Sequence, residues 1–273
     1  MSTSSCEKWA TAITRINRNS IVVRGYGLEE LIGSVSFAEA VYLLLKGELP
    51  KGHEALMMDA ILVSCIDHGL TSPSTRVARI VASAGSPPVS ALAAGLLAFT
   101  EYHGGAIEGA MHLFHETHEK FLRSEGSSLQ EIVRATVRKQ RRLGKRIPGF
   151  GHQLHTEDPR SRRLIALANE WKLAGTYVEI VETYRAVLAE QMEKAVPLNV
   201  DGCIAALLCE LGFEPRSANL FFAISRSAGL SAHIQEEQTR ERVMRDIDFS
   251  SVEYDGPQDR QCPAQKRRGF GSS

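Results

Sequence analysis

Ile147-Pro-Gly-Phe-Gly-His152 is the stretch around which this chain is organised. Two glycines that flank an aromatic residue directly after a proline cannot form the interior of a helix or of a central strand, so we expect a tight loop. Glycine there lets backbone N–H groups approach a ligand closely, because no Cβ is in the way. The loop ends on His152, a type of side chain that titrates near neutral pH.

Positive charge lies on both sides of this loop, with Arg141, Arg142, Lys145 and Arg146 before it and Arg160 after it. This outline is typical of a site for an anionic substrate that contains a proton-transfer residue. From the loop alone, a surface turn with an incidental histidine is an equally good interpretation. The basic run could likewise be the solvated face of a helix.

The composition is that of an ordinary soluble globular protein. The 273 residues are 43% apolar and 23% charged, and 32 Lys and Arg balance 32 Asp and Glu. This length suits one large domain, or a large and a small one. The balanced charge excludes a bulk field that would attract nucleic acid or an anionic membrane, so anion binding must come from local clusters.

Cysteine usage and the N-terminus indicate a cytoplasmic protein. The chain has 5 cysteines, none of them in a C-x-x-C pair, which favours free thiols in a reducing compartment over disulfides or a zinc site. Residues 1–15 lack an apolar core of signal-peptide length. No apolar run approaches the length needed to span a membrane.

The spacing of apolar residues predicts a chain that is almost entirely helical. Strands are expected only near the N-terminus, as a hairpin around residues 17–20, and at 252–254. Ser36 and Glu39 form a capping-box pattern at the start of a helix that ends at Gly47. Further helices are predicted at about residues 52–68, 74–84, 89–102, 106–122, 127–144, 159–173, 177–196, 197–212, 216–230 and 232–246.

Several residues that could carry chemistry lie at unusual places. His68, His103 and His152 all fall at helix breaks next to glycine, and Asp201 lies in the first turn of an apolar helix. Arg226 stands alone in another apolar helix. An unpaired buried ion costs on the order of several kcal/mol, so Arg226 is expected to meet a buried anion, either a substrate or an internal carboxylate.

An acid, two histidines and several arginines suit carbon–carbon chemistry of the aldol or Claisen type without a metal. A carboxylate can move a proton at a carbon next to a carbonyl, a neutral histidine can hydrogen-bond the resulting enol oxygen, and a second histidine can move a hydroxyl proton. Arginines hold polycarboxylates in bidentate geometry. His112, His115 and His118 share one helix face, but without a Cys or acidic partner we expect three exposed histidines rather than a metal site.

Five separated motifs occur in order along the chain. They are Gly25-Tyr26 with residues 37–50, His103-Gly-Gly-Ala106, Pro148-Gly-Phe-Gly-His152 with Asp158-Pro-Arg160, Asn199-Val-Asp201, and Arg226 with Ala232-His233. Together they resemble the citrate synthase superfamily, over a span from about residue 13 to residue 257. Any one of these motifs would be a weak signal, whereas five in the right order are specific.

The resemblance implies roles for three catalytic residues. Asp201 would be the acid/base at the acetyl carbon, and His103 would stabilise the enol of acetyl-coenzyme A. His152 would handle the proton on the oxygen at C2 of oxaloacetate, which becomes the citryl hydroxyl.

The resemblance also implies two sets of binding residues. The carboxylates of oxaloacetate or citrate would be bound by His68, Arg160 and Arg226, and by Arg245 acting in a neighbouring subunit. Asp246 stands after Arg245 where the family usually has proline. Coenzyme A would be bound by Lys145, Arg146, Gly149 and Gly151.

The implied fold is the all-α, citrate synthase-like fold, with minor β structure near the N-terminus. A large domain would comprise residues 1–105 and 210–257, and a small domain residues 106–209, with a disordered tail at 258–273. The active site would lie in the cleft between the domains, and their closure would exclude water from the enol. A homodimer or homotetramer is expected, because the family borrows a site residue from the neighbouring subunit.

The chain is shorter than citrate synthases, and four segments are similar to citryl-CoA lyases, including the C-terminal module of ATP citrate lyase. These segments are Asp67-His-Gly69, the break at Ala84-Gly85, Gly95-Leu-Leu97 ahead of Gly104-Gly-Ala106, and Asn199-Val-Asp-Gly202. The implied reaction is cleavage of citryl-CoA to acetyl-CoA and oxaloacetate, with no metal and no tightly bound cofactor. Two alternatives stay open: an acyltransferase of the citrate or 2-methylcitrate synthase type, and a non-catalytic relative that binds acyl-CoA.

Overall fold

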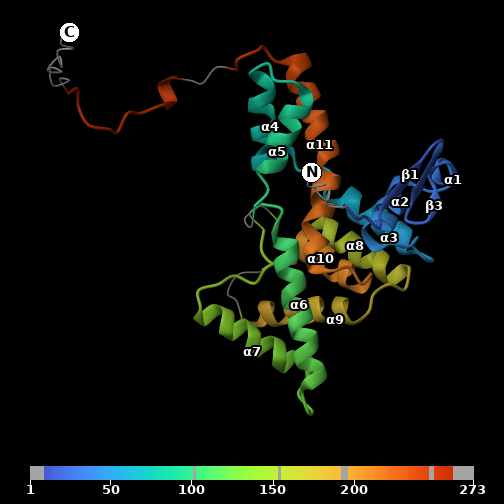
Figure 1. The fold of residues 1–273 in the computed structure, drawn as a ribbon. Helices are drawn as coiled ribbons and strands as arrows, with labels where there is room; N and C mark the ends of the chain where they lie inside the picture. Colours follow the sequence, from blue (N-terminus) through green and yellow to red (C-terminus); the bar gives the residue numbers. More distant parts are fainter. Residues whose placement is uncertain (1–8, 101–102, 153–154, 192–195, 246–248, 261–273) are drawn as a thin grey trace, which may run out of the picture.

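The computed structural model describes residues 9–100, 103–152, 155–191, 196–245 and 249–260. Figure 1 shows that these residues form a mostly helical molecule with one small sheet near the N-terminus. The predicted all-α class, with minor β structure at that end, is confirmed. From residue 261 onward, the predicted tail lies outside the described residues.

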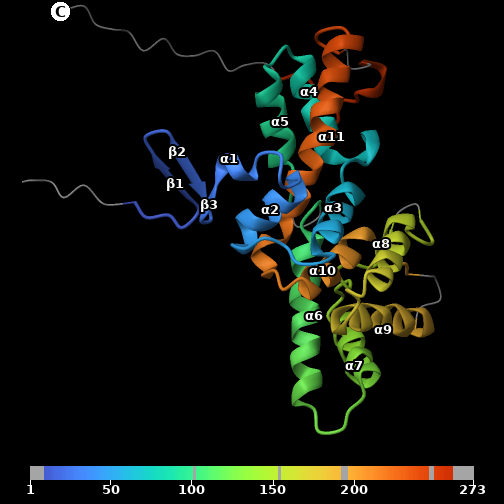
Figure 2. The ribbon, with the colours of Figure 1, turned by 90° about the vertical axis from the view of Figure 1, so that its right-hand side faces the viewer.

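The sheet is a three-stranded antiparallel meander of β1 (Thr14–Asn17), β2 (Ser20–Val23) and β3 (Tyr26–Gly27). Asn17 pairs with Ser20, so the predicted hairpin turns where the sequence placed it. A short helix, α1 (Leu28–Leu31), follows directly. Figure 2 shows the sheet projecting sideways from the helices.

Helix α2 (Phe37–Lys46) begins at the predicted capping box. The hydroxyl of Ser36 accepts from the backbone N–H of Glu39 at 3.2 Å, and the Glu39 carboxylate accepts from the Ser36 N–H at 2.7 Å. These two bonds satisfy backbone donors that a helix start would otherwise leave unpaired. The helix ends at Gly47, whose φ of 95° is left-handed.

The rest of the described chain is helical apart from its loops. Its elements are α3 (Glu54–Ser64), η1 (Gly69–Thr71), α4 (Pro73–Ser83), α5 (Pro88–Leu97), α6 (Ala106–Arg123), α7 (Leu129–Arg142), α8 (Pro159–Glu170), α9 (Thr176–Gln191), α10 (Val200–Glu210), η2 (Pro215–Ser217), α11 (Ala218–Arg240) and η3 (Phe249–Ser251).

Three sequence predictions about these elements were wrong. The helix that we expected to be capped by Ser127 is capped by Ser128 and begins at Leu129. The helices predicted at 216–230 and 232–246 are one continuous helix, α11. In the described part of the C-terminal region, residues 252–254 form no strand.

Most helices share one apolar core. Among its fully buried members are Met57 of α3, Met111 and Phe114 of α6, Tyr184 of α9 and Phe221 of α11. Burial of such side chains typically contributes about 1.5–3 kcal/mol each, so this core is the main source of stability. Helix α10 lies within it, with every residue from Gly202 to Cys209 buried.

A second, smaller cluster packs α4 and α5 against the C-terminal half of α11. It consists of Ala78, Ala82, Ala91, Leu230 and Ile234. Because α11 contributes to both clusters, this one helix connects the α4–α5 end of the molecule with its middle in Figures 1 and 2. The domain boundaries expected from the sequence stay a prediction.

The cysteines and histidines away from the motifs have structural surroundings. Cys65, Cys203 and Cys209 are free thiols, as the sequence predicted, and all three are buried. We expected His115 to be exposed, but it is partly buried. Its Nδ1 lies 2.8 Å from the hydroxyl of Tyr177, and its Nε2 lies 3.5 Å from Sγ of Cys209. No helix of the described chain is both long and apolar enough to cross a membrane.

Candidate active site

The glycine loop is tied to the segment that starts α10. Gly149 and Gly151 have left-handed φ values of 84° and 97°, which only glycine adopts without strain. The N–H of Gly151 donates to the carbonyl of Pro197 at 2.7 Å, and the N–H of Asn199 donates to the carbonyl of Gly149 at 3.1 Å. Phe150 between the two glycines is buried. The loop is therefore held between the core and the start of α10.

Asn199 fixes both sides of this junction. Its side-chain Nδ2 donates to the carbonyl of Gly151 at 3.0 Å, while its Oδ1 accepts from the N–H of Gly202 at 3.1 Å. The second bond is an N-cap of α10. One side chain thus sets the distance between the His152 loop and the first turn that carries Asp201.

Asp158 is buried at the N-cap of α8 and organises a second junction. Its carboxylate accepts from Nε and Nη2 of Arg160 at 3.0 and 2.8 Å, and from the backbone N–H of Val200 at 3.0 Å. Burial alone would raise the pKa of Asp158, but the bonds from Arg160 and Val200 hold it below its ordinary value. A charged Asp158 therefore holds the guanidinium of Arg160 next to the start of α10.

Asp201 lies in the first turn of α10. Burial raises the pKa of its carboxyl group, and this effect outweighs the attraction of Arg160 and Arg226, which both act on the carboxylate. A carboxyl group in this position retains its proton at a higher pH than an ordinary aspartate does. It is suited to give a proton to a carbon or to take one from it.

His103 stands between two hydroxyl groups and two aromatic rings. Its Nε2 lies 2.9 Å from Oγ of Ser74 and 3.3 Å from Oγ of Ser72. The ring centroids of Phe99 and Phe222 lie 5.4 and 6.1 Å from that of His103. Two serines of the α4 start therefore fix the orientation of this imidazole.

Arg226 is buried in α11 and shares Ser72 with His103. Its Nη1 donates to Oγ of Ser72 at 3.2 Å, its Nε donates to the carbonyl of Cys65 at 3.0 Å, and its guanidinium lies 4.7 Å from the ring centre of Phe222. In the described part of the chain these hydrogen bonds go to neutral groups, not to a carboxylate. No carboxylate takes part in these two bonds, although the charges of Asp67 and Asp201 act on Arg226 electrostatically.

The pKa values of both predicted catalytic histidines are lowered, which favours the neutral imidazole. Burial lowers the pKa of His103, and the charge of Arg226 and nearby His68 lower it further. Burial and the neighbouring His155 likewise lower the pKa of His152. A neutral imidazole can donate one hydrogen bond or accept a proton at neutral pH.

The tautomer of His152 follows from its backbone contact. The N–H of His155 donates to Nδ1 of His152 at 3.1 Å, so Nδ1 is an acceptor and the neutral ring carries its proton on Nε2. The ring of His68 lies 5.9 Å from that of His152, centroid to centroid. Two histidines from distant parts of the chain thus face the same place.

The structure brings six of the predicted site residues together. The rings of His68 and His152 are in contact, and each of the other residues shifts, or is shifted by, the pKa of another member of the set. The six residues are His68, His103, His152, Arg160, Asp201 and Arg226.

The other predicted binding residues lie elsewhere. Lys145 and Arg146 are exposed in the turn before the glycine loop. Arg245 lies beyond α11, where its Nε and Nη2 bind Glu237 at 2.9 and 2.7 Å. The expectation that Arg245 serves a neighbouring subunit stays a prediction.

Sequence reasoning missed Ser72, Ser74 and the structural part played by Asp158 and Asn199. Asp158 and Asn199 lie inside the quoted motifs, and their short polar side chains before helices are typical caps, so a capping signal was present. Ser72 and Ser74 flank Pro73 at a helix start and carry no comparable signal, because hydroxyl residues are common there.

The described residues contain no group of three or more His, Cys, Asp or Glu side chains placed to hold a metal ion. A cavity of about 480 Å³ borders the turn after His103 and is lined in part by Gly104, Gly105, Gly109 and Asn219. A larger cavity, about 870 Å³, lies between α8 and α9 with Asp158 in its wall.

Residues 51–246 match the sequence profile of the family described as citrate synthase, C-terminal domain. A solved structure of citryl-CoA lyase from Hydrogenobacter thermophilus is 41% identical to this chain, with a TM-score of 0.86. That match covers 94% of this chain and 98% of the other. The predicted citrate synthase-like fold is thereby confirmed.

Two curated relatives are longer than this chain. Citrate synthase 2 of Bacillus subtilis is 30% identical over 81% of this chain and 56% of its own length. ATP-citrate synthase beta chain protein 1 of Oryza sativa subsp. japonica is 28% identical over 86% of this chain and 38% of its own length. The chain thus spans about half, or less, of the curated relatives that it matches.

Proposed function

The chain belongs to the citrate synthase family, and we propose that within it this protein is a citryl-CoA lyase that cleaves citryl-CoA to acetyl-CoA and oxaloacetate. One observation carries the choice of reaction: the 41% identity to a citryl-CoA lyase extends over 94% of this chain and 98% of that one. The relative named citrate synthase is less similar and matches over 56% of its length.

In the proposed cleavage, neutral His152 removes the proton from the citryl hydroxyl group through Nδ1, the nitrogen without a proton, which exchanges its bond from the His155 N–H for the substrate hydroxyl. The bond between the carbinol carbon and the methylene carbon of the thioester arm then breaks. The oxygen electrons form the ketone of oxaloacetate, and the bonding pair moves into the thioester to give the enolate of acetyl-CoA. The neutral state of His152 at physiological pH supports this assignment, because a base must enter the step without its extra proton.

We propose that His103 stabilises the enolate oxygen and that Asp201 protonates the enolate carbon. Since Nε2 of His103 is engaged by Ser72 and Ser74, its Nδ1 is the nitrogen assigned to the substrate oxygen. The raised pKa of Asp201 supports its role, because a protonated carboxyl group is needed to complete acetyl-CoA. His152 takes one proton from the hydroxyl group and Asp201 gives one proton to the enolate carbon, so the number of protons is conserved.

His68, Arg160 and Arg226 are proposed to bind the substrate carboxylates, and Arg245 to serve the site of a neighbouring subunit in a homodimer or homotetramer. The hydrogen bonds of Arg226 to neutral groups support its part, because neither of them places a carboxylate against the buried positive charge. Coenzyme A is proposed to lie along Lys145, Arg146, Gly149 and Gly151. Family membership supports a coenzyme A thioester as substrate, with no cofactor proposed.

Two parallel incubations of the purified protein test the reaction. Citryl-CoA is expected to give acetyl-CoA and oxaloacetate, whereas acetyl-CoA plus oxaloacetate is expected to give little free thiol. Prompt release of thiol with formation of citrate would instead assign the protein to the acyltransferases.

The acyltransferase is the second candidate, because of the 30% identity to citrate synthase 2 of Bacillus subtilis. The same residues would then act in reverse, with Asp201 removing the proton from the acetyl carbon.

A further inference from the structure

Helix α11 presents one face to the segment that leads to His68. Arg226, Gly229 and His233 are spaced at i, i+3 and i+7, which places them along one side of a helix. Arg226 binds the carbonyl of Cys65 at 3.0 Å, and Ser225 one residue earlier binds the carbonyl of Leu62. The end of α3 is therefore bound to the middle of α11.

Gly229 continues this contact by close approach. A Cβ at Gly229 would lie 3.0 Å from Cβ and Oδ1 of Asp67, and it would clash with the carbonyl oxygen of Ile66. Glycine is therefore required where residues 66–67 cross α11.

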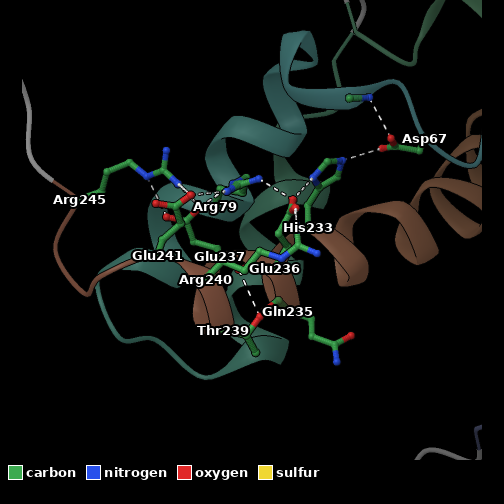
Figure 3. Close-up of polar contacts among 11 residues, drawn as sticks. Asp67, Arg79, His233, Gln235, Glu236, Glu237, Thr239, Arg240, Glu241 and Arg245 are labelled. Atoms are coloured by element: carbon green, nitrogen blue, oxygen red, sulfur yellow. Dashed lines mark hydrogen bonds and ion pairs between the residues drawn. The ribbon is translucent and has the colours of Figure 1, made fainter.

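His233 completes the row one turn further along. Its Nε2 lies 3.2 Å from Oδ1 of Asp67. Hydrogen bonds from Gly69 and His233 hold the pKa of Asp67 below its ordinary value although burial opposes this, so Asp67 is a carboxylate acceptor and Nε2 of His233 is the donor. Figure 3 shows His233 lying between Asp67 and Glu236.

Glu236 connects His233 to α4. One carboxylate oxygen of Glu236 lies 3.7 Å from Nδ1 of His233, and the same oxygen accepts from Nη1 of Arg79 at 2.9 Å. Arg240 binds the other oxygen at 2.7 Å. In Figure 3 these contacts form a continuous row from Arg79 to Asp67.

The other end of the row determines the turn that carries His68. Oδ2 of Asp67 accepts from the backbone N–H of Gly69 at 2.9 Å. This bond closes a turn with His68 between the two bonded residues. Gly69 has a left-handed φ of 64°. The ring of His68, held in this turn, lies 5.9 Å from that of His152.

We propose that His233 is a positioning residue: through Asp67 it holds the turn at residues 67–69 so that His68 faces His152 and the substrate carboxylate. His233 does not itself contact the substrate. The inference rests on the proposed function only for the effect on turnover, because the placement of His68 is a property of the folded chain with or without catalysis.

A double-mutant cycle tests the effect on turnover. His233→Leu removes the donor, and we expect it to lower kcat/KM for citryl-CoA roughly tenfold to a hundredfold, because a displacement of about 1 Å can cost that much. In a His68→Ala background the same substitution is expected to change kcat/KM less than about twofold. His233→Gln keeps an N–H donor near the position of Nε2 and is expected to restore most of the activity.

Gln235→Leu is the matched control, because Gln235 is exposed on the same helix. We expect it to leave kcat/KM unchanged. An equal loss from His233→Leu with and without His68, or an equal loss from Gln235→Leu, would overturn the proposal.

A spectroscopic measurement on the full chain works even if citryl-CoA is not the substrate. In protein labelled with 13C at histidine Cε1, the His68 signal is identified by its loss in His68→Ala. We expect this signal to shift in His233→Leu and to stay in place in Gln235→Leu. If His233→Leu does not fold, Asp67→Asn, which keeps the volume and removes the charge, is expected to shift the same signal. A His68 signal that stays in place in the folded variant contradicts the proposal, whatever the turnover shows.

Discussion

Gly149 and Gly202 touch backbone to backbone: a Cβ on Gly149 would lie 2.5 Å from the Cα of Gly202. The first glycine belongs to the loop that ends on His152, and the second directly follows Asp201. Real Cβ atoms essentially never approach so closely, so both positions require glycine. This contact sets how near the proposed base and the proposed acid can lie.

Gly202→Ala tests this contact. The added methyl group would push the glycine loop away from α10, and we expect a loss of about 1–3 kcal/mol in the free energy of unfolding together with a fall in kcat. Gly109→Ala is the matched control, because its Cβ would meet Pro148 at an ordinary 3.7 Å. Alanine in a helix is favoured over glycine by about 1 kcal/mol, so the control is expected to be neutral or stabilising in urea unfolding. Equal stabilities for the two variants would contradict this reading of the junction.

Asp201→Asn is expected to abolish turnover and to stabilise the fold. Loss of the proton-transfer group should lower kcat about 10²- to 10⁴-fold. Because the folded state holds the Asp201 proton more tightly than the unfolded chain, wild-type stability falls as pH rises above the ordinary value of 3.8 toward the raised folded value. The variant should therefore have the higher Tm at pH 7, by an amount that shrinks toward pH 3.8. Full turnover in the variant would support the non-catalytic alternative for this residue.

Asp158→Ala is expected to be one of the most damaging single substitutions in the chain. It leaves the half-buried Arg160 without its carboxylate and the buried N–H of Val200 without its acceptor, which typically costs about 3–5 kcal/mol. Glu157→Ala, one residue earlier, breaks an exposed pair with Arg162 and should cost less than about 1 kcal/mol. Thermal unfolding of both variants compares the loss of a buried ion pair with the loss of a surface one. Similar Tm values for the two variants would contradict the larger contribution expected of Asp158.

The pH dependence of cleavage reports on His152. Its neutral form is the proposed base, so kcat/KM should fall on the acid side with an apparent pKa below the ordinary histidine value of 6.5. His155, whose ring centroid lies 4.3 Å from that of His152, lowers this pKa, so removal of its imidazole in His155→Asn should move the acid limb upward. An acid limb above 6.5 in the wild type, or one that moves down in His155→Asn, would argue against His152 as the base.

Local signals explain how much of the fold could be read from the sequence. The Ser36–Glu39 capping box and the turn at residues 17–20 are set by neighbouring residues, and both are present. The break predicted after Leu230 failed because Gly229 serves for close approach to residues 66–67, not for ending a helix. A close approach depends on the partner segment, which sequence spacing does not reveal.

The site shows the same limit. The helix pattern placed His68, His103 and His152 at helix breaks and Asp201 in the first turn of a helix. Only the family resemblance brought these four residues together, because they are separated by tens of residues. The hydroxyl groups of Ser72 and Ser74 and the His233–Asp67 contact depend on tertiary packing and had no local pattern.

Cleavage of citryl-CoA in D₂O, followed by mass analysis of the products, tests the central claim most directly. If His152 opens the carbon–carbon bond and Asp201 delivers the final proton, the wild type forms oxaloacetate and acetyl-CoA that carries one deuterium in its methyl group, and Asp201→Asn forms neither at a comparable rate. Citrate and free coenzyme A as the only products would show that the thioester, not the carbon–carbon bond, is broken, and would contradict the lyase.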